Sequence, residues 1–197
     1  MDLVDRMDPR PVREHSVVFS GAVWDVVRDV VDLGPAGEVT REFIRHPGAV
    51  AVVALDEDER VVLLHQYRHP TATVEWEIPA GLRDVHGEAP VVTAARELAE
   101  EADLTADTWH HLIEVTTSPG SSTELITVFL ARGLRPVAVG DRHIRQGEEQ
   151  GMAVERFPLA EVRSAVLSGR VRNATLAVAV LAACASREEG WSSLRPA

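Results

Sequence analysis

The order of strand-like and helix-like segments limits what this chain can fold into. Val and aromatic residues dominate residues 16–33, as in strands, and the segment after Pro90 carries Ala, Leu, Glu and Arg at helical density. Strands are predicted at residues 16–33, 38–45, 49–55, 60–67, 75–80, 109–117, 124–131 and 153–157, and helices at 90–102, 158–168 and 173–186. Because strands and helices do not alternate regularly, a doubly wound parallel sheet is excluded. The order predicts an α+β domain with a mixed sheet and an N-terminal segment of antiparallel strands.

Turn and capping residues set several boundaries of these segments. Pro90 suits the first position of a helix, and Asn173 suits the residue that caps one. The acidic run at 56–59 is typical of a solvated turn between two strands, so residues 49–67 are predicted to form a hairpin.

Composition excludes several classes of protein. The 197 residues can bury a substantial core, and a formal net charge of −11 disfavours non-specific nucleic-acid binding and anionic membrane surfaces. The longest strongly apolar stretch, 176–185, is too short to span a bilayer. The N-terminus is charged and lacks the apolar region of a secretory signal, and a single cysteine, Cys184, excludes an intramolecular disulfide. We expect a cytoplasmic protein without nucleic-acid or membrane partners.

Acidic residues gather on the first predicted helix. Glu97 and Glu101 are four residues apart and therefore share one helix face, with Glu100 beside them. Like charges at this spacing repel, so a cation between them would explain the arrangement, and carboxylate oxygens are ligands that Mg²⁺ prefers. Arg96 follows Glu88 by eight residues, and the two could hold the preceding loop against the helix. A solvated helix face with salt bridges is the alternative that these residues alone leave open.

The wider pattern resembles the Nudix box, usually written G-x5-E-x7-R-E-U-x-E-E-x-G-U with U a bulky aliphatic residue. The matching positions are Gly81, Glu88, Arg96, Glu97, Leu98, Glu100, Glu101 and Leu104. Two departures stand out, because six residues separate Gly81 from Glu88 and Asp103 replaces the second glycine. The longer loop is similar to the PAGLLD…GE form of the bacterial ADP-ribose pyrophosphatase branch. Asp tolerates the left-handed backbone conformation better than most residues, so a helix end could survive the replacement.

The resemblance implies a fold, a division of the chain and a metal site. The fold is a mixed β-sheet sandwiched between helices, with residues 46–190 as the hydrolase domain. Residues 1–45 would be a β-rich segment that serves dimerisation and completes the substrate site. The resemblance implies Mg²⁺, with Mn²⁺ as the alternative ion, bound by Glu97, Glu101 and the carbonyl of Ala80. Glu100 would be a third ligand or act just outside the metal, and Arg96 would orient the helix.

The resemblance also implies substrate and base residues. Arg68 and Glu77 match positions that bind substrate, and Pro119 lies 15 residues beyond Leu104, as in relatives that cleave ADP-ribose. Gly120 follows it, but the aromatic residue expected next is missing. The acidic loop at 147–151 would supply the glutamate that activates water, with Glu148 as the best match and Glu149 as its alternative.

The function implied is metal-dependent hydrolysis of ADP-ribose to AMP and ribose 5-phosphate by a homodimer. Three alternatives stay open. The first is the same reaction on another nucleoside diphosphate sugar or on a dinucleotide, and the second is hydrolysis of a nucleoside triphosphate. The third is a sensor that binds a nucleotide without cleaving it.

Overall fold

The computed structural model describes residues 3–145 and 150–197. Its longer strands are β1 (Val12–Ser20), β2 (Asp25–Asp32), β3 (Glu38–Arg45), β4 (Ala49–Ala54), β5 (Arg60–Arg68), β6 (Thr73–Glu77), β9 (Thr108–Thr116), β10 (Leu125–Arg132) and β12 (Ala153–Pro158). The short strands are β7 (Ala80–Leu82), β8 (Leu104–Thr105), β11 (Arg135–Pro136) and β13 (Arg195–Pro196). The α-helices of this part of the chain are α1 (Pro90–Ala102), α2 (Leu159–Leu167) and α3 (Ala174–Glu188). None of the described helices is long and apolar enough to cross a membrane.

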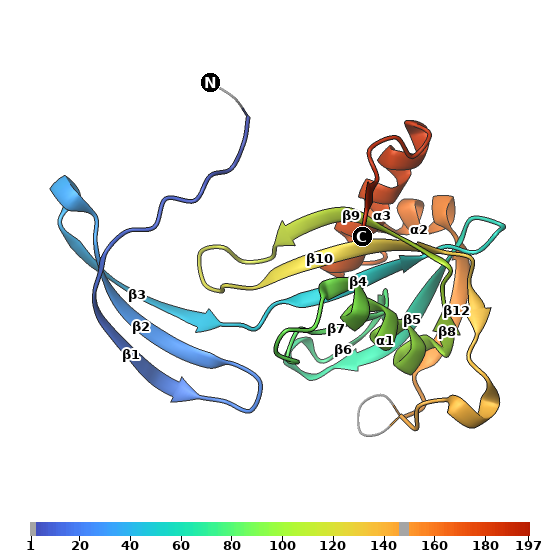
Figure 1. The fold of residues 1–197 in the computed structure, drawn as a ribbon, viewed down its shortest axis with the longest axis horizontal. Helices are drawn as coiled ribbons and strands as arrows, with labels where there is room; N and C mark the ends of the chain where they lie inside the picture. Colours follow the sequence, from blue (N-terminus) through green and yellow to red (C-terminus); the bar gives the residue numbers. More distant parts are fainter. Residues whose placement is uncertain (1–2, 146–149) are drawn as a thin grey trace. The chain divides into compact units, whose positions relative to one another are not determined.

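The chain divides into two compact units (Figure 1). One unit holds the residues up to Pro47 together with the loop Ser118–Glu124. Its antiparallel sheet has the order β1-β2-β3, and the loop joins it through a bridge between Ile44 and Ser122. Opposite charges face each other across its strands, as in the Arg28–Glu42 pair at 2.7 Å. This sheet confirms the predicted antiparallel strands, although β1 begins at Val12, earlier than expected.

The second unit, Gly48–Thr117 with Leu125–Ala197, contains the mixed sheet that the sequence predicts. Its five-stranded sheet has the order β13-β9-β10-β4-β7, in which β10 runs parallel to β4 and antiparallel to β9. A three-stranded sheet with the order β12-β5-β6 lies in the same unit. The α+β fold class is therefore confirmed.

Strand β4 explains how the helices cover both faces of the sheet. Every residue of β4 is buried, and alternate side chains point to opposite faces. Ala49, Ala51 and Val53 belong to a core that also holds apolar residues of α2 and α3. Val50, Val52 and Ala54 belong to a second core, which Ala94 and Leu98 of α1 complete. The sheet is thus sandwiched between α1 on one face and α2 with α3 on the other.

The predicted hairpin over residues 49–67 is wrong. Strands β4 and β5 belong to different sheets, and only an isolated bridge between Leu55 and Val61 links their ends. The turn between them forms as expected, because Asp56 Oδ1 accepts hydrogen bonds from the backbone N–H groups of Asp58 and Arg60. However, β10 and β7 occupy both edges of β4, and β12 and β6 occupy both edges of β5. A turn residue does not reveal these distant partners.

Candidate functional site

Helix α1 carries the candidate site, and its ends are set by local chemistry. Pro90 stands in its first turn, where the missing N–H group costs nothing. Asp103 ends the helix with a left-handed backbone, φ +54°, and its N–H group bonds to the carbonyl of Ala99 at 3.2 Å. The apolar residues of α1 pack on the sheet, and Glu101 is buried on the same side. The helix therefore points one carboxylate inward, toward the strands.

Strand β7 receives the carboxylates of α1. The backbone N–H of Ala80 donates a hydrogen bond to Glu101 Oε2 at 2.8 Å, and Glu101 is only 6% exposed. The neighbouring Gly81 faces Glu97 so closely that an added Cβ would lie 2.0 Å from the carboxyl carbon of Glu97. A glycine is required here because the carboxylate occupies the space that a side chain would need. The structure thus brings together Ala80, Glu97 and Glu101, the residues that the resemblance implies as metal ligands.

Arg96 lies among the remaining acids of the helix and its loop. It contacts Glu97 at 2.7 Å, Glu100 at 3.3 Å and Glu88 at 3.7 Å. Burial by itself would lower the pKa of Arg96, but the charges of Glu97, Glu100 and Glu88 outweigh it and raise the pKa. Glu88 also accepts a hydrogen bond from Thr93 Oγ1 at 2.7 Å, which ties the loop to the first turns of α1.

The donor set fits a divalent metal ion. Within residues 3–145 and 150–197, no three His, Cys, Asp or Glu side chains are gathered as a metal-binding cluster. However, Glu97 and Glu101 reach adjacent residues of β7 from one helix face, and Glu100 lies on the same turn. Carboxylates outnumber the single guanidinium among these contacts, and their oxygens are the ligands that Mg²⁺ and similar ions prefer. A cation would offset this excess of negative charge.

The candidate substrate residues Arg68 and Glu77 bind each other. The Nε and Nη2 atoms of Arg68 donate to the two carboxylate oxygens of Glu77, both at 2.7 Å. Glu77 is buried, whereas the side chain of Arg68 is 42% exposed. This bidentate pair holds the guanidinium plane in one orientation while leaving part of it at the surface.

The other candidate residues lie in two loops, of which the structure describes one in full. Pro119 and Gly120 belong to the loop 118–124, where the N–H groups of Ser121 and Ser122 both bond to the Ser118 carbonyl at 2.9 Å. This loop belongs to the unit of β1–β3. Glu148 and Glu149 lie outside the described residues.

The sequence did not indicate that residues 141–145 lie against the C-terminal part of α1. Arg145 pairs with Asp103 at 2.7 Å, although 42 residues separate the two in the chain. Next to this pair is an open cavity of about 580 Å³, lined by Arg96, Ala99, Glu100 and residues 141–144. Asp103 stood out in the sequence as a departure from the Nudix box, but no spacing rule identifies its partner.

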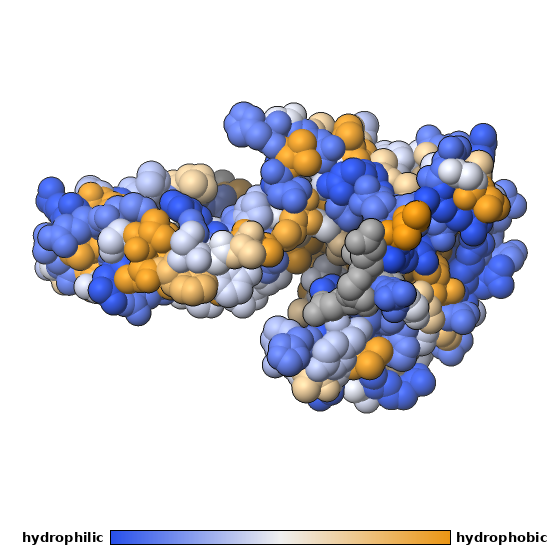
Figure 2. Space-filling model, turned by 90° about the horizontal axis from the view of Figure 1, so that it is seen from below, coloured by the Kyte–Doolittle hydropathy of each residue, from blue (hydrophilic) through white to orange (hydrophobic). Residues whose placement is uncertain are grey.

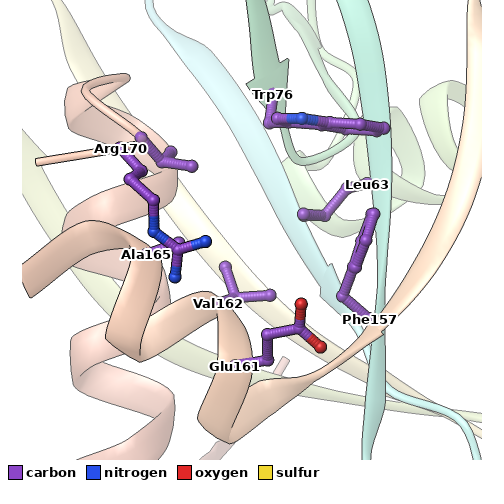
Figure 3. Close-up of a pocket in the computed structure, with 8 residues that line it drawn as sticks. Leu63, Trp76, Phe157, Glu161, Val162, Ala165 and Arg170 are labelled. Atoms are coloured by element: carbon purple, nitrogen blue, oxygen red, sulfur yellow. The ribbon is translucent and has the colours of Figure 1, made fainter. Parts of the chain in front are cut away.

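A smaller pocket, of about 160 Å³, lies between α2 and the face of the three-stranded sheet that points away from α1 (Figure 3). Trp76 and Phe157 line it from the sheet, and the side chains of Glu161 and Arg170 point into the space between α2 and these rings. Among the residues that the structure describes, none of those predicted for chemistry lines it. The carboxylates of α1 therefore remain the candidate active site.

Comparison with known proteins gives consistent matches. A model of the NUDIX domain matches residues 45–176. An ADP-ribose pyrophosphatase of Mycobacterium tuberculosis is 42% identical over 179 residues, which cover 91% of this chain and 84% of that protein. An ADP-ribose pyrophosphatase of Bacillus subtilis is 35% identical over 163 residues, or 83% and 86% of the two chains. A solved structure described as an ADP compounds hydrolase superposes with a TM-score of 0.74 at 20% identity, covering 95% of this chain and 99% of that chain.

Proposed function

The chain belongs to the Nudix family, and we propose that it hydrolyses the diphosphate bond of ADP-ribose to give AMP and ribose 5-phosphate. The similarity over more than four fifths of two ADP-ribose pyrophosphatases carries the proposal. The contacts of Glu97 and Glu101 with β7 support it, because they bring these two acids of the family motif next to the adjacent residues Ala80 and Gly81.

The reaction needs a divalent metal ion, and we propose Mg²⁺, with Mn²⁺ as the alternative. Such an ion would neutralise phosphate oxygens and lower the pKa of the attacking water. Glu97, Glu101 and the carbonyl of Ala80 would hold it, with Glu100 as a further ligand or close neighbour. Arg96 keeps the helix and its loop in register through its contacts with Glu97, Glu100 and Glu88.

Substrate binding is assigned to residues outside the helix. Arg68, oriented by Glu77, suits a phosphate oxygen pair because a guanidinium offers two parallel donors. Pro119 and Gly120 would contact the nucleotide. Glu148, or Glu149 as its alternative, would accept the proton of the attacking water.

We propose that residues 46–190 form the hydrolase domain, and that residues 1–45 serve a homodimer. Every residue of β1 is exposed, and the segment up to β2 exposes several large apolar side chains: Val12, Val17, Val18, Phe19, Val23 and Trp24. Apolar patches are visible on this sheet (left in Figure 2). Exposed apolar patches on an edge strand are typical of protein interfaces. A cytoplasmic location stays a prediction, which rests on the sequence alone.

A substrate panel tests the function. Purified protein is incubated with ADP-ribose, other nucleoside diphosphate sugars, dinucleotides and nucleoside triphosphates, with Mg²⁺, with Mn²⁺ and with a chelator. We expect metal-dependent release of AMP from ADP-ribose at the highest kcat/KM of the panel. A higher kcat/KM for another compound would show that this compound, and not ADP-ribose, is the preferred substrate. Binding of ADP-ribose by folded protein without cleavage of any compound would favour the sensor alternative instead.

A further inference from the structure

Asp103 is unfavourable at the end of α1 for two reasons, its backbone conformation and its charge. Its backbone is left-handed, with φ +54°, a region that glycine adopts without a steric penalty and that Asp, although it tolerates it better than most residues, adopts less readily. It also places a negative charge at the C-terminal end of α1, where the helix dipole is already negative. Glycine, which the family motif has at this position, would avoid both costs. Something in the folded protein must offset them.

The offsetting interaction is with Arg145. The Nη2 atom of Arg145 donates to Asp103 Oδ2 at 2.7 Å, and its Nε donates to the backbone carbonyl of Glu100 at 3.2 Å. The side chains of Asp103 and Arg145 are only 22% and 20% exposed, so water screens the pair incompletely. Arg142 adds a weaker contact with Asp103 at 4.0 Å.

The Glu100 carbonyl matters because it lies in the last turn of α1. A carbonyl there has no partner within the helix, and Arg145 provides one. The same turn carries Glu100 and Glu101, which Arg96 and the Ala80 N–H hold from the other side. Arg145 therefore fixes the backbone that presents these carboxylates.

The pair also fixes the far wall of a cavity beside the site. The open cavity of about 580 Å³ lies between α1, at Arg96 and Glu100, and the segment 141–144. Arg145 directly follows this segment, and Arg142 within it donates to the Val137 carbonyl at 3.4 Å. Contacts at both of these arginines keep the wall next to the helix.

We propose that the Asp103–Arg145 ion pair is a positioning device for the reaction, which locks the last turn of α1 and the segment 141–145 together beside the catalytic carboxylates. The aspartate that replaces the second glycine of the Nudix box would therefore have a function of its own, as the partner of Arg145. The proposal rests on the proposed function, because its effect is read in turnover of ADP-ribose.

The decisive variant is Asp103→Gly, because it should lower activity without lowering stability. Glycine relieves the left-handed backbone and removes the charge at the helix end, so the midpoint of thermal unfolding should stay the same or rise. Loss of the pair should lower kcat for ADP-ribose about 10-fold, with KM unchanged. Arg145→Gln, which also removes the bond to the Glu100 carbonyl, should lower kcat at least as much. The double variant should lose no more than Arg145→Gln alone, because the two residues act as one unit.

The matched control is Asp107→Asn, which removes the nearby Asp107–Arg135 ion pair at 2.6 Å. That pair is more exposed, at 47% and 70%, and both of its residues lie outside α1, so kcat should stay at the wild-type value. Unchanged kcat in folded Asp103→Gly would overturn the proposal. A fall in kcat that occurs only with a matching fall in the unfolding midpoint would also overturn it, since the pair would then be merely structural.

Wild-type turnover is measured first, so the two claims fail separately. If the wild-type protein cleaves no ADP-ribose, the proposed function fails, and the variants are then compared on the panel compound that is cleaved. If the wild-type protein cleaves ADP-ribose and the variants match it, only the positioning role fails.

Discussion

At the scale of single residues, the contact of Gly81 with Glu97 makes a direct prediction. In Gly81→Ala the new Cβ would lie 2.0 Å from the Glu97 carboxyl carbon, so the carboxylate must move away. The free energy of unfolding should change little, because the displaced group is the end of a flexible side chain. The value of kcat should fall about 100-fold, since a proposed metal ligand would be displaced by an ångström or more.

The control for this variant is Gly140→Ala. No atom of the described residues lies within 4 Å of a Cβ added at Gly140, so both stability and kcat should match the wild type. Steady-state kinetics and thermal unfolding of both variants check the prediction. A Gly81→Ala protein with wild-type kcat would show that Glu97 need not occupy its observed position.

Asp56 gives a prediction of pH dependence. Burial opposes its ionised form, but hydrogen bonds from the N–H groups of Arg60 and Asp58 and the charges of Arg60 and Arg156 outweigh burial and lower the pKa of this carboxyl. A lowered pKa in the folded state means that the carboxylate adds stability above the unfolded-state pKa of about 3.9. This stability is lost as the pH falls through the lower, folded-state pKa.

The variant Asp56→Ala should therefore be less stable than the wild type by about 1–3 kcal/mol at pH 7, the usual cost of losing charged hydrogen bonds. The difference should shrink steadily below about pH 4. Urea unfolding of both proteins between pH 7 and pH 3 measures it. A difference that is the same at both ends of this range would contradict the assigned role of the carboxylate.

At the scale of elements, the start of α3 follows from one residue. Asn173 caps the helix as predicted, with its Oδ1 accepting from the N–H of Leu176 at 3.0 Å. We expect Asn173→Ala to lower the free energy of unfolding by about 1 kcal/mol, and Asn173→Ser, which keeps an acceptor oxygen, to lower it less. Equal losses in denaturant unfolding of the two variants would show that the cap is not what stabilises this helix.

The elements also show which information the sequence carries. Features that depend on near neighbours in the chain were predictable: the shared face of Glu97 and Glu101, the start of α1 at Pro90 and the cap at Asn173. Features that depend on distant partners were not. The strands β4 and β5 join different sheets because their edges are filled by β7, β10, β6 and β12. The partner of Asp103 likewise comes from a segment that no periodicity connects to α1.

At the scale of the whole molecule, the proposed homodimer depends on the apolar side chains of the β1 segment. Phe19 is 58% exposed, and Phe19→Asp would put a charge into an interface built on it. We expect wild-type protein to sediment at twice the 21.5 kDa mass of the chain, and this variant to sediment as a monomer at micromolar concentration.

The control is Val139→Asp, in the other unit, where Val139 is 81% exposed. This variant should keep the oligomeric state of the wild type. A wild-type protein that is monomeric at every concentration would contradict the dimer, and a dimeric Phe19→Asp protein would move the interface away from the β1 segment.

We propose that the carboxylates of α1 perform metal-dependent hydrolysis of ADP-ribose, and AMP release by Glu101→Gln tests this role. The amide keeps the size of the side chain and can still accept the hydrogen bond from Ala80, so the fold should persist. Loss of the charge should lower kcat by about 100-fold or more at saturating Mg²⁺. Glu161→Gln, on the opposite face of the sheet, should keep wild-type activity. A folded Glu101→Gln protein that releases AMP at the wild-type rate would show that this carboxylate is not needed for the reaction.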